Sequence, residues 1–198
     1  MIRGFHLADW ITLANGCSGT AAIFVVLEHL QAPQAVSLLW AAGLIALAFV
    51  LDELDGRVAR QRHEQSLLGR ELDSLSDVIS FGVAPATFAY GVGMQGLWDV
   101  AVLLAFVACG VSRHARYNIT ADKLAAGGAK PKYYEGTPIP SSLLLVGVLA
   151  LAVRQGRAGD ALWLGSVRLG PGTLHPLVLM FALSGSLMIS KTIRIPKP

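Results

Sequence analysis

Residues 51–80 read LDELDGRVARQRHEQSLLGRELDSLSDVIS, and four aspartates stand in this stretch at helical spacing. Asp52 and Asp55 are three residues apart, and Asp73 and Asp77 are four apart, so each pair lies on one face of a helix. Two such helices packed antiparallel would bring all four carboxylates together. The stretch also stands between two long apolar runs, which places the acidic residues beside or within a membrane.

A short turn near Arg62 to Ser66 would join the two helices. Convergent carboxylates repel one another unless cations lie among them. Carboxylate oxygens at this density suit magnesium, manganese or calcium better than zinc. The simpler alternative is that these aspartates are solvated residues at helix ends with no shared function. Chance alone would rarely add the glycines and the Ala-Arg pair at these positions, which argues against that alternative.

Composition indicates one helical membrane domain covering residues 1–198. The chain is 54% hydrophobic and 15% charged, and its apolar residues come in long blocks without amphipathic spacing. The net charge is only +3, and the basic residues gather at the ends of apolar blocks. A nucleic-acid surface is therefore not expected, whereas contact with membrane lipids is.

The apolar blocks predict an all-α polytopic protein with six transmembrane helices. We expect a polar loop over Asn118 to Pro138 and another over Arg154 to Gly172, and Pro85 predicts a kink. The predicted helices are about Ala8 to Leu30, Ala35 to Arg60, Leu72 to Tyr90, Leu97 to Tyr117, Ile139 to Val153 and Thr173 to Ile189.

Lysine and arginine are distributed unevenly between the two sides that six spans would create. One side would hold only Arg154, Arg157 and Arg168, and the other would hold all the remaining basic residues. The excess of basic residues marks the cytoplasmic side. Both termini and the acidic stretch, with its polar metal site, are therefore predicted to face the cytoplasm, in the inner membrane of the cell.

The acidic stretch resembles the signature of the CDP-alcohol phosphotransferases, which are integral membrane enzymes of phospholipid synthesis. Written as D-x2-D-G-x2-A-R-x8-G-x3-D-x3-D, it fills every fixed position of that signature. The resemblance implies two divalent ions, Mg²⁺ or Mn²⁺. It implies that Asp52, Asp55 and Asp73 hold one ion, and that Asp77 shares the second and acts as general base.

The resemblance also implies a nucleotide site that shares Asp52. The signature residues Gly56, Ala59, Arg60 and Gly69 are expected to shape or contact the cytidine diphosphate of a CDP-lipid. A glycine at position 56 lets a phosphate approach the backbone closely. Asn15, a polar residue in the first apolar block, is a candidate either for bonding the nucleotide or for a hydrogen bond between helices.

Within the family, further blocks resemble the phosphatidylserine synthases. The aspartate signature continues as DVISFGVAPA over residues 77–86, and similar blocks are ITLANGCSG at 11–19, YYEGTPIPSS at 133–142 and LMISKTIR at 187–194. At 112–118 the chain has SRHARYN where those enzymes more often have LRLARFN. The resemblance implies transfer of a phosphatidyl group from CDP-diacylglycerol to L-serine with release of CMP, and a homodimer.

Arg113 and Arg116 are three residues apart near a predicted helix end. They are candidates for binding the acceptor carboxylate or a lipid phosphate. Arginines at a membrane boundary also commonly anchor to lipid head groups, and both interpretations stay open.

Two other functions remain alternatives. A sister enzyme of the family would use glycerol 3-phosphate or inositol phosphate as acceptor. A divalent-cation transporter would use the acidic cluster as its binding site, although transport gives no reason for the fixed glycine, alanine and arginine. The histidines His29, His63 and His175 have no partners at metal-ligand spacing and are expected to face water or lipid head groups.

Overall fold

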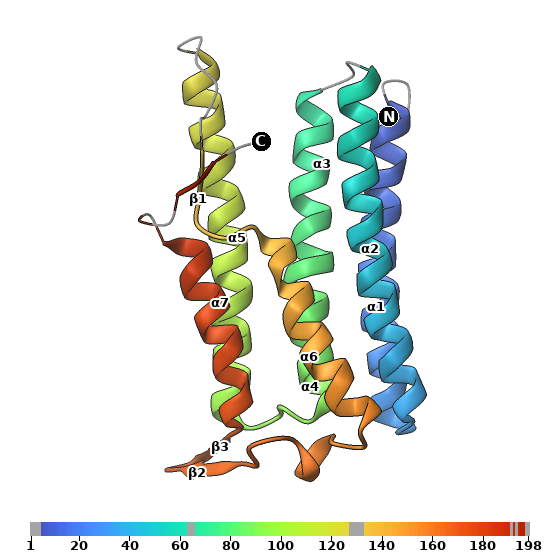
Figure 1. Ribbon diagram of the computed structural model, residues 1–198, viewed down its shortest axis with the longest axis vertical. Coiled ribbons are helices and arrows are strands. Elements are labelled where there is room, and N and C mark those ends of the chain that lie inside the picture. The colour runs from blue at the N-terminus through green and yellow to red at the C-terminus, as the bar shows by residue number, and fades with distance from the viewer. Residues whose placement is uncertain (1–4, 63–65, 127–132, 191, 193, 197–198) are drawn as a thin grey trace.

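The computed structural model describes residues 5–62, 66–126, 133–190, 192 and 194–196. It is a bundle of helices standing roughly side by side along one long axis (Figure 1). The helices are α1 (Leu7–Gln31), α2 (Ala35–Arg62), α3 (Leu67–Asp77), α4 (Ala84–Val92), α5 (Leu97–Ala126), α6 (Ser142–Arg154) and α7 (Leu179–Ile189). Between α3 and α4 the chain continues through the π-helix η1 (Val78–Val83).

Short elements connect these helices. The 3-10 turns are η2 (Ile139–Ser141), η3 (Gly159–Ala161) and η4 (Pro176–Val178), and the strands are β1 (Tyr133–Glu135), β2 (Val167–Leu169), β3 (Gly172–Leu174) and β4 (Arg194–Pro196). Strand β1 pairs antiparallel with β4, and β2 with β3. The β2–β3 hairpin closes the end of the bundle opposite the N-terminus (Figure 1).

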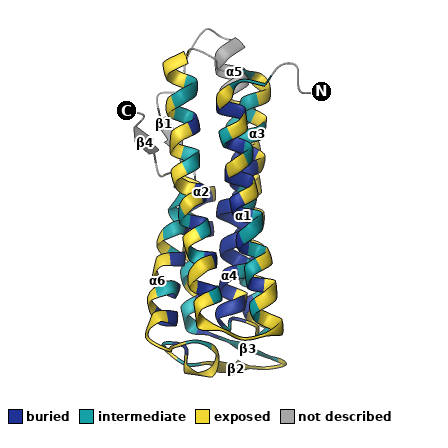
Figure 2. Cartoon of the chain, turned by 90° about the vertical axis from the view of Figure 1, so that its right-hand side faces the viewer, coloured by how far each residue is buried: buried dark blue, intermediate teal, exposed yellow. Residues whose placement is uncertain are grey.

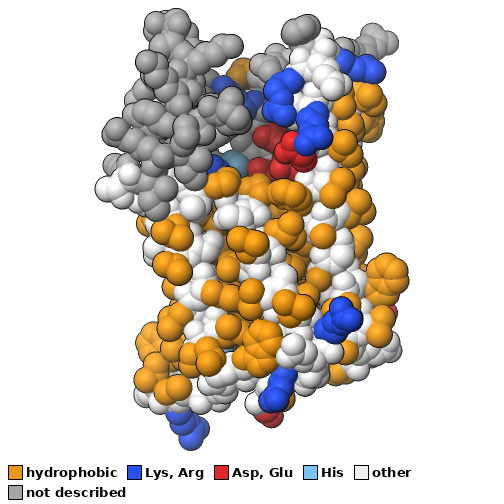
Figure 3. Space-filling view, in the orientation of Figure 1, with side chains coloured by type: hydrophobic (Ala, Val, Ile, Leu, Met, Phe, Trp, Pro, Cys, Tyr) orange, Lys and Arg blue, Asp and Glu red, His pale blue; other side chains and the backbone are white. Residues whose placement is uncertain are grey.

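Four helical segments in the described part of the chain are long and apolar enough to cross a membrane: Leu7–Gln31, Ala35–Arg62, Leu67–Val92 and Leu97–Thr120. Shorter apolar helices run over Ile139–Arg154 and Pro176–Ile189. The predicted class, a helical membrane protein, is confirmed. Exposed apolar side chains cover much of the bundle, as lipid contact requires (Figures 2 and 3).

Several predicted boundaries were wrong. Helix α3 begins at Leu67, five residues before the predicted start, because the Ser66 hydroxyl caps it by accepting a hydrogen bond from the Gly69 amide. Helix α5 runs to Ala126, so the front part of the predicted 118–138 loop is helical, and its last part includes β1.

The sixth predicted helix was also too long. The residues from Gly172 to Leu174 form β3 instead, with Gly170 in the hairpin turn at a φ of 54° that favours glycine. The Pro85 kink was expected within a regular helix, but the residues before it form the π-helix, where the Ala84 amide bonds the carbonyl of Ile79.

The helix α1 holds the bundle together through its small side chains. Its buried positions recur along one face and include Thr12, Asn15, Gly16 and Gly19. It packs against α2, α3, η1 and α4, and Figure 2 shows its inner face buried along most of its length. Small residues of this kind let helix backbones approach closely inside membranes.

The crossing of α1 with α3 and η1 is especially tight. A Cβ added to Gly16 would lie 3.0 Å from the Ser76 hydroxyl, and one added to Gly19 would lie 2.7 Å from the Cα of Ser80. The Ser80 hydroxyl in turn donates to the backbone carbonyl of Asn15 at 3.0 Å. Glycine and serine together therefore set how close the third helical segment lies to the first.

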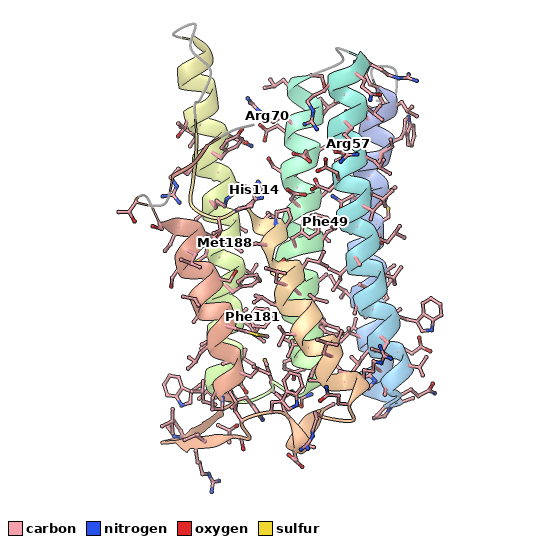
Figure 4. The ribbon with its side chains drawn as sticks, viewed as in Figure 1. Phe49, Arg57, Arg70, His114, Phe181 and Met188 are labelled. Atoms are coloured by element: carbon pink, nitrogen blue, oxygen red, sulfur yellow. The ribbon has the colours of Figure 1, made fainter. Side chains whose placement is uncertain are left out.

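Large apolar side chains fill the half of the bundle away from the acidic residues. Phe81, Phe88, Phe106 and Phe181 are fully buried there, and the rings of Phe106 and Phe181 meet edge to face with centroids 5.2 Å apart. Figure 4 shows Phe181 on α7 pointing into this core.

The prediction that His175 faces water was wrong. Its ring is buried, and its Nδ1 lies 2.7 Å from Asp99 Oδ2 while its backbone N–H donates to Asp99 Oδ1 at 2.7 Å. Asp99 also accepts from the Gly96 amide. The Asp99–His175 pair therefore joins the start of α5 to the residues that precede α7. His29 is partly exposed and bonds the backbone of Gln34, and His63 lies outside the described residues.

The glycine contact makes a prediction about stability. Gly19→Ala should destabilise the protein by roughly 1–3 kcal/mol, because the new methyl group meets backbone atoms that cannot rotate away. Gly43→Ala is the matched control, since a Cβ at Gly43 meets none of the described residues within 4 Å, and it should leave stability unchanged or slightly raised. Thermal unfolding of both variants in detergent tests this; equal midpoints would contradict the tight crossing.

Candidate metal and substrate site

The four aspartates come from two neighbouring helical segments. Asp52 and Asp55 lie on α2, and Asp73 and Asp77 lie at the end of α3. One carboxylate oxygen from each of Asp52, Asp55 and Asp73 lies within 4.8 Å of the others. The Asp52 carboxylate also interacts directly with the carboxylates of Asp73 and Asp77. The structure therefore brings together the four carboxylates that the sequence pattern singled out.

Asp55 is held in place from the first helix. The Thr12 hydroxyl on α1 donates to Asp55 Oδ2, and Asp55 is only 5% exposed. Thr12 was not predicted as a site residue, although it is one of the polar residues that interrupt the first apolar block. Its contact makes α1 part of the site, because it orients a carboxylate that α2 supplies.

The two signature glycines have different surroundings. A Cβ at Gly69 would lie 2.7 Å from Asp9 Oδ1, so glycine at this position lets the Asp9 side chain of α1 lie against the start of α3. A Cβ at Gly56 would meet only the guanidinium of Arg60, at an ordinary 3.5 Å. Packing among the described residues therefore gives no reason for glycine at position 56, and the space beside it is open to a ligand.

A cavity of about 770 Å³ opens at the aspartates. Its acidic wall also carries the predicted residues Gly56, Ala59, Arg60 and Gly69. Figure 3 shows the acidic side chains in a hollow above the apolar belt, with basic side chains beside them. The opposite wall comes from α5 and the turn before α6: Arg113, His114, Tyr117, Asn118, Pro138 and Pro140.

A hydrogen-bond network joins the two walls. The Asn118 amide on α5 donates to the Ser74 hydroxyl on α3 at 3.1 Å and to the Glu71 carboxylate at 3.4 Å. Ser74 stands one residue after Asp73, so this network fixes α5 against the acidic helix. The SRHARYN block thus contributes to the same cavity as the aspartate signature.

The structure separates the two arginines of that block. Arg113 is buried and lines the cavity. Arg116 is not among the lining residues; its guanidinium donates to the backbone carbonyls of Ile189 and Met188, at 3.1 and 3.5 Å, at the end of α7. Arg116 therefore lies at the C-terminal end of α7, where a cation can bond the last carbonyls of a helix, and its binding of the acceptor carboxylate or a lipid phosphate stays a prediction.

Asn15 is not among the residues that line the cavity. It is completely buried, and neither polar atom of its side chain has a hydrogen-bond partner within the described ranges. The interhelical side-chain bond that the sequence suggested is therefore not found among the described residues, where the backbone carbonyl of Asn15 accepts from Ser80, and the nucleotide contact stays a prediction.

His114 is a cavity residue that the sequence did not single out. Its Nε2 lies 3.7 Å from Asp77 Oδ2, and the residue is 8% exposed. Figure 4 shows His114 projecting from α5 toward the space beside α3. The only sequence signal was the departure from LRLARFN, which has leucine at this position.

The donor set fits divalent metal ions. All four side chains offer hard carboxylate oxygens, and Asp77 Oδ1 is buried without a hydrogen-bond partner among the residues that the structure describes. Two carboxylates about 4 Å apart repel by roughly 4 kcal/mol near a protein surface, and a divalent cation between them reverses the sign of that interaction. Magnesium and manganese suit such a site, since they take a few carboxylates and leave positions for substrate phosphates.

Comparison with known proteins agrees with the geometry. The model of the CDP-alcohol phosphatidyltransferase family matches residues 5–185. A protein of Saccharomyces cerevisiae named CDP-diacylglycerol–serine O-phosphatidyltransferase is 43% identical over 201 residues, covering 100% of this chain and 73% of the yeast protein.

Prokaryotic proteins of the same name are also similar. The Mycobacterium tuberculosis protein is 40% identical over 153 residues, and the Methanocaldococcus jannaschii protein is 37% identical over 146 residues. These alignments cover 76% and 73% of this chain, and 51% and 61% of the relatives. The chain therefore spans about half the length of the mycobacterial protein.

The acidic cluster predicts that metal binding stabilises the protein without any substrate. Mn²⁺ or Mg²⁺ should raise the thermal unfolding midpoint, because a bound cation relieves the repulsion among the carboxylates. Asp52→Asn should remove most of that increase, since Asp52 contacts two of the other aspartates. Asp160→Asn, an exposed aspartate near the opposite end of the bundle, is the control and should respond as the wild type does. An unchanged response in Asp52→Asn would contradict the assignment.

Proposed function

Because the chain belongs to the CDP-alcohol phosphatidyltransferase family, we propose that it transfers a phosphatidyl group from CDP-diacylglycerol to L-serine, giving phosphatidylserine and CMP. The observation that carries the proposal is the convergence of Asp52, Asp55, Asp73 and Asp77 at one cavity. The names of the relatives at 37–43% identity support serine as the acceptor.

The aspartates would hold two divalent ions, Mg²⁺ or Mn²⁺. Asp52, Asp55 and Asp73 hold one of them, and Asp77 shares the second. When bound, such ions neutralise the pyrophosphate of the CDP-lipid and the charge that develops on the departing CMP. Thr12 keeps Asp55 oriented for this task through its hydroxyl.

The nucleotide would lie along α2. Gly56 leaves open space beside the acidic cluster, and Ala59 and Arg60 line the same wall one turn further on. A small residue lets the diphosphate approach the backbone, and a guanidinium binds phosphate oxygens with two parallel hydrogen bonds. Gly69 contributes indirectly, because it lets α3 approach α1 at Asp9.

Asp77 would act as the general base. It lies at the junction of α3 and the π-helix, faces the cavity, and has one buried oxygen without a partner in the described part of the chain. It takes the proton of the serine hydroxyl as the serine oxygen bonds the lipid-side phosphorus. The bond from that phosphorus to the CMP oxygen breaks, and CMP leaves with the electron pair.

The arrangement in the membrane belongs to the same proposal. We infer six spans, with α6 and α7 as the two short ones, and both termini on the cytoplasmic side. The basic residues support this orientation, and it places the aspartates where a nucleotide-activated lipid is available. The homodimer expected from the family resemblance stays a prediction, which the mass of the detergent-purified protein would test.

The acceptor is tested with purified protein, CDP-diacylglycerol and Mn²⁺ or Mg²⁺, scored by CMP release. L-Serine should outcompete glycerol 3-phosphate and inositol phosphate, and EDTA should abolish turnover. Preference for a phosphorylated acceptor would reassign the chain to a sister activity. Metal uptake into liposomes without CMP release would instead identify a cation transporter.

The base assignment makes a separate prediction. Asp77→Asn keeps the shape and one ligand oxygen but cannot accept a proton, so turnover should fall by a factor of about 10² to 10⁴ even at saturating metal. CDP-lipid binding should survive in part, because the other three aspartates remain. Turnover and nucleotide affinity are measured across a metal titration. Full recovery of the rate at high metal would show that Asp77 is only a ligand.

A further inference from the structure

His114 is a buried polar group that the chemistry described so far does not use. It extends from α5 into the wall of the cavity opposite α2, beside Arg113. Within the described residues its Nε2 has no hydrogen-bond partner, and the mostly buried side chain is 11% exposed where it lines the cavity. A buried nitrogen left unpaired is costly, so His114 is placed for a partner that arrives with the substrate.

The neighbour of that nitrogen suggests which partner this is. Asp77 Oδ2 lies 3.7 Å away, which is too long for a hydrogen bond but short enough for one oxygen atom to contact both groups. A carboxylate only accepts hydrogen bonds, and an imidazole N–H donates them. A hydroxyl can do both at once, accepting from His114 and donating to Asp77.

We propose that His114 is a positioning residue that holds the acceptor hydroxyl against Asp77; this rests on the proposed function. The hydroxyl oxygen accepts a hydrogen bond from Nε2–H and points its own proton at Asp77. The proton passes to Asp77 as the oxygen bonds phosphorus and CMP departs. His114 keeps its proton throughout and orients the oxygen lone pair.

The position of Arg113 agrees with this arrangement. Arg113 lines the same wall of the cavity as His114. A small amino acid whose hydroxyl lies between His114 and Asp77 would have its carboxylate within reach of that wall. Guanidinium groups are well suited to bind carboxylates. The α5 wall would then bind the acceptor, while the α2 wall binds the nucleotide.

Two substitutions of His114 separate hydrogen bonding from packing. His114→Leu keeps a side chain of similar bulk without the nitrogen, and His114→Gln keeps an N–H donor at a comparable distance along the side chain. His29→Gln, at a partly exposed histidine near the end of α1, is the control. Each protein is assayed for kcat and KM with serine, KM for CDP-diacylglycerol, and the midpoint of the Mn²⁺ titration.

His114→Leu should lower kcat/KM for serine by about 10-fold to 100-fold, the usual range for losing a hydrogen bond to a charged or reacting group. His114→Gln should recover most of that loss. The KM for CDP-diacylglycerol and the Mn²⁺ midpoint should change by less than about twofold in both variants, because His114 touches neither the nucleotide nor the metal in this assignment.

Three results would overturn the proposal. An unchanged kcat/KM for serine in His114→Leu would show that His114 does not position the acceptor hydroxyl. A shifted Mn²⁺ midpoint would make His114 a metal ligand. An equal loss of kcat/KM for serine in both variants, together with a lowered thermal unfolding midpoint, would show that His114 is a packing residue. Failure of the proposed function gives a different result, because the wild-type protein would then not use serine. In that case the same variants would be assayed with the acceptor that the wild-type protein prefers.

Discussion

The mutual repulsion of four carboxylates is the constraint on which the rest of this structure depends. Asp52, Asp55, Asp73 and Asp77 lie together at the polar end of an apolar bundle, where water screens their charges poorly. Such a cluster is unfavourable for the protein alone and becomes favourable when cations and phosphates join it. The fold therefore has to hold these side chains together against their own electrostatics.

Helix α1 provides most of that restraint. Its glycines let α3 and the π-helix approach closely, and Thr12 bonds Asp55 across the same interface. The Ser18 hydroxyl donates to the Leu44 carbonyl on α2, which ties the first helix to the second as well. The apolar core around Phe81 lies directly beyond Asp77 and gives the site a rigid base. The aspartates are the candidate metal ligands, and contacts from α1 hold them in position.

Local periodicity predicted much of this arrangement and failed where contacts between distant segments decide it. The spacing of the four aspartates indicated one shared face. The lengths of the apolar blocks located the helices, although the start of α3, the end of α5 and the start of α7 were missed by about five to nine residues. The roles of Thr12 and His114 were missed, because each depends on a partner far along the chain. His175 was misplaced for the same reason, because it bonds the buried Asp99, and the bond from Arg116 to a backbone carbonyl of α7 could not be read from spacing either.

The central claim is that the cluster binds two metal ions at once. The most direct measurement is the number of Mn²⁺ ions bound per chain, combined with electron paramagnetic resonance of the loaded protein in detergent. Two ions held about 4 Å apart should give two bound Mn²⁺ per chain and a spin-coupled spectrum. One Mn²⁺ per chain with the spectrum of an isolated ion would contradict the account.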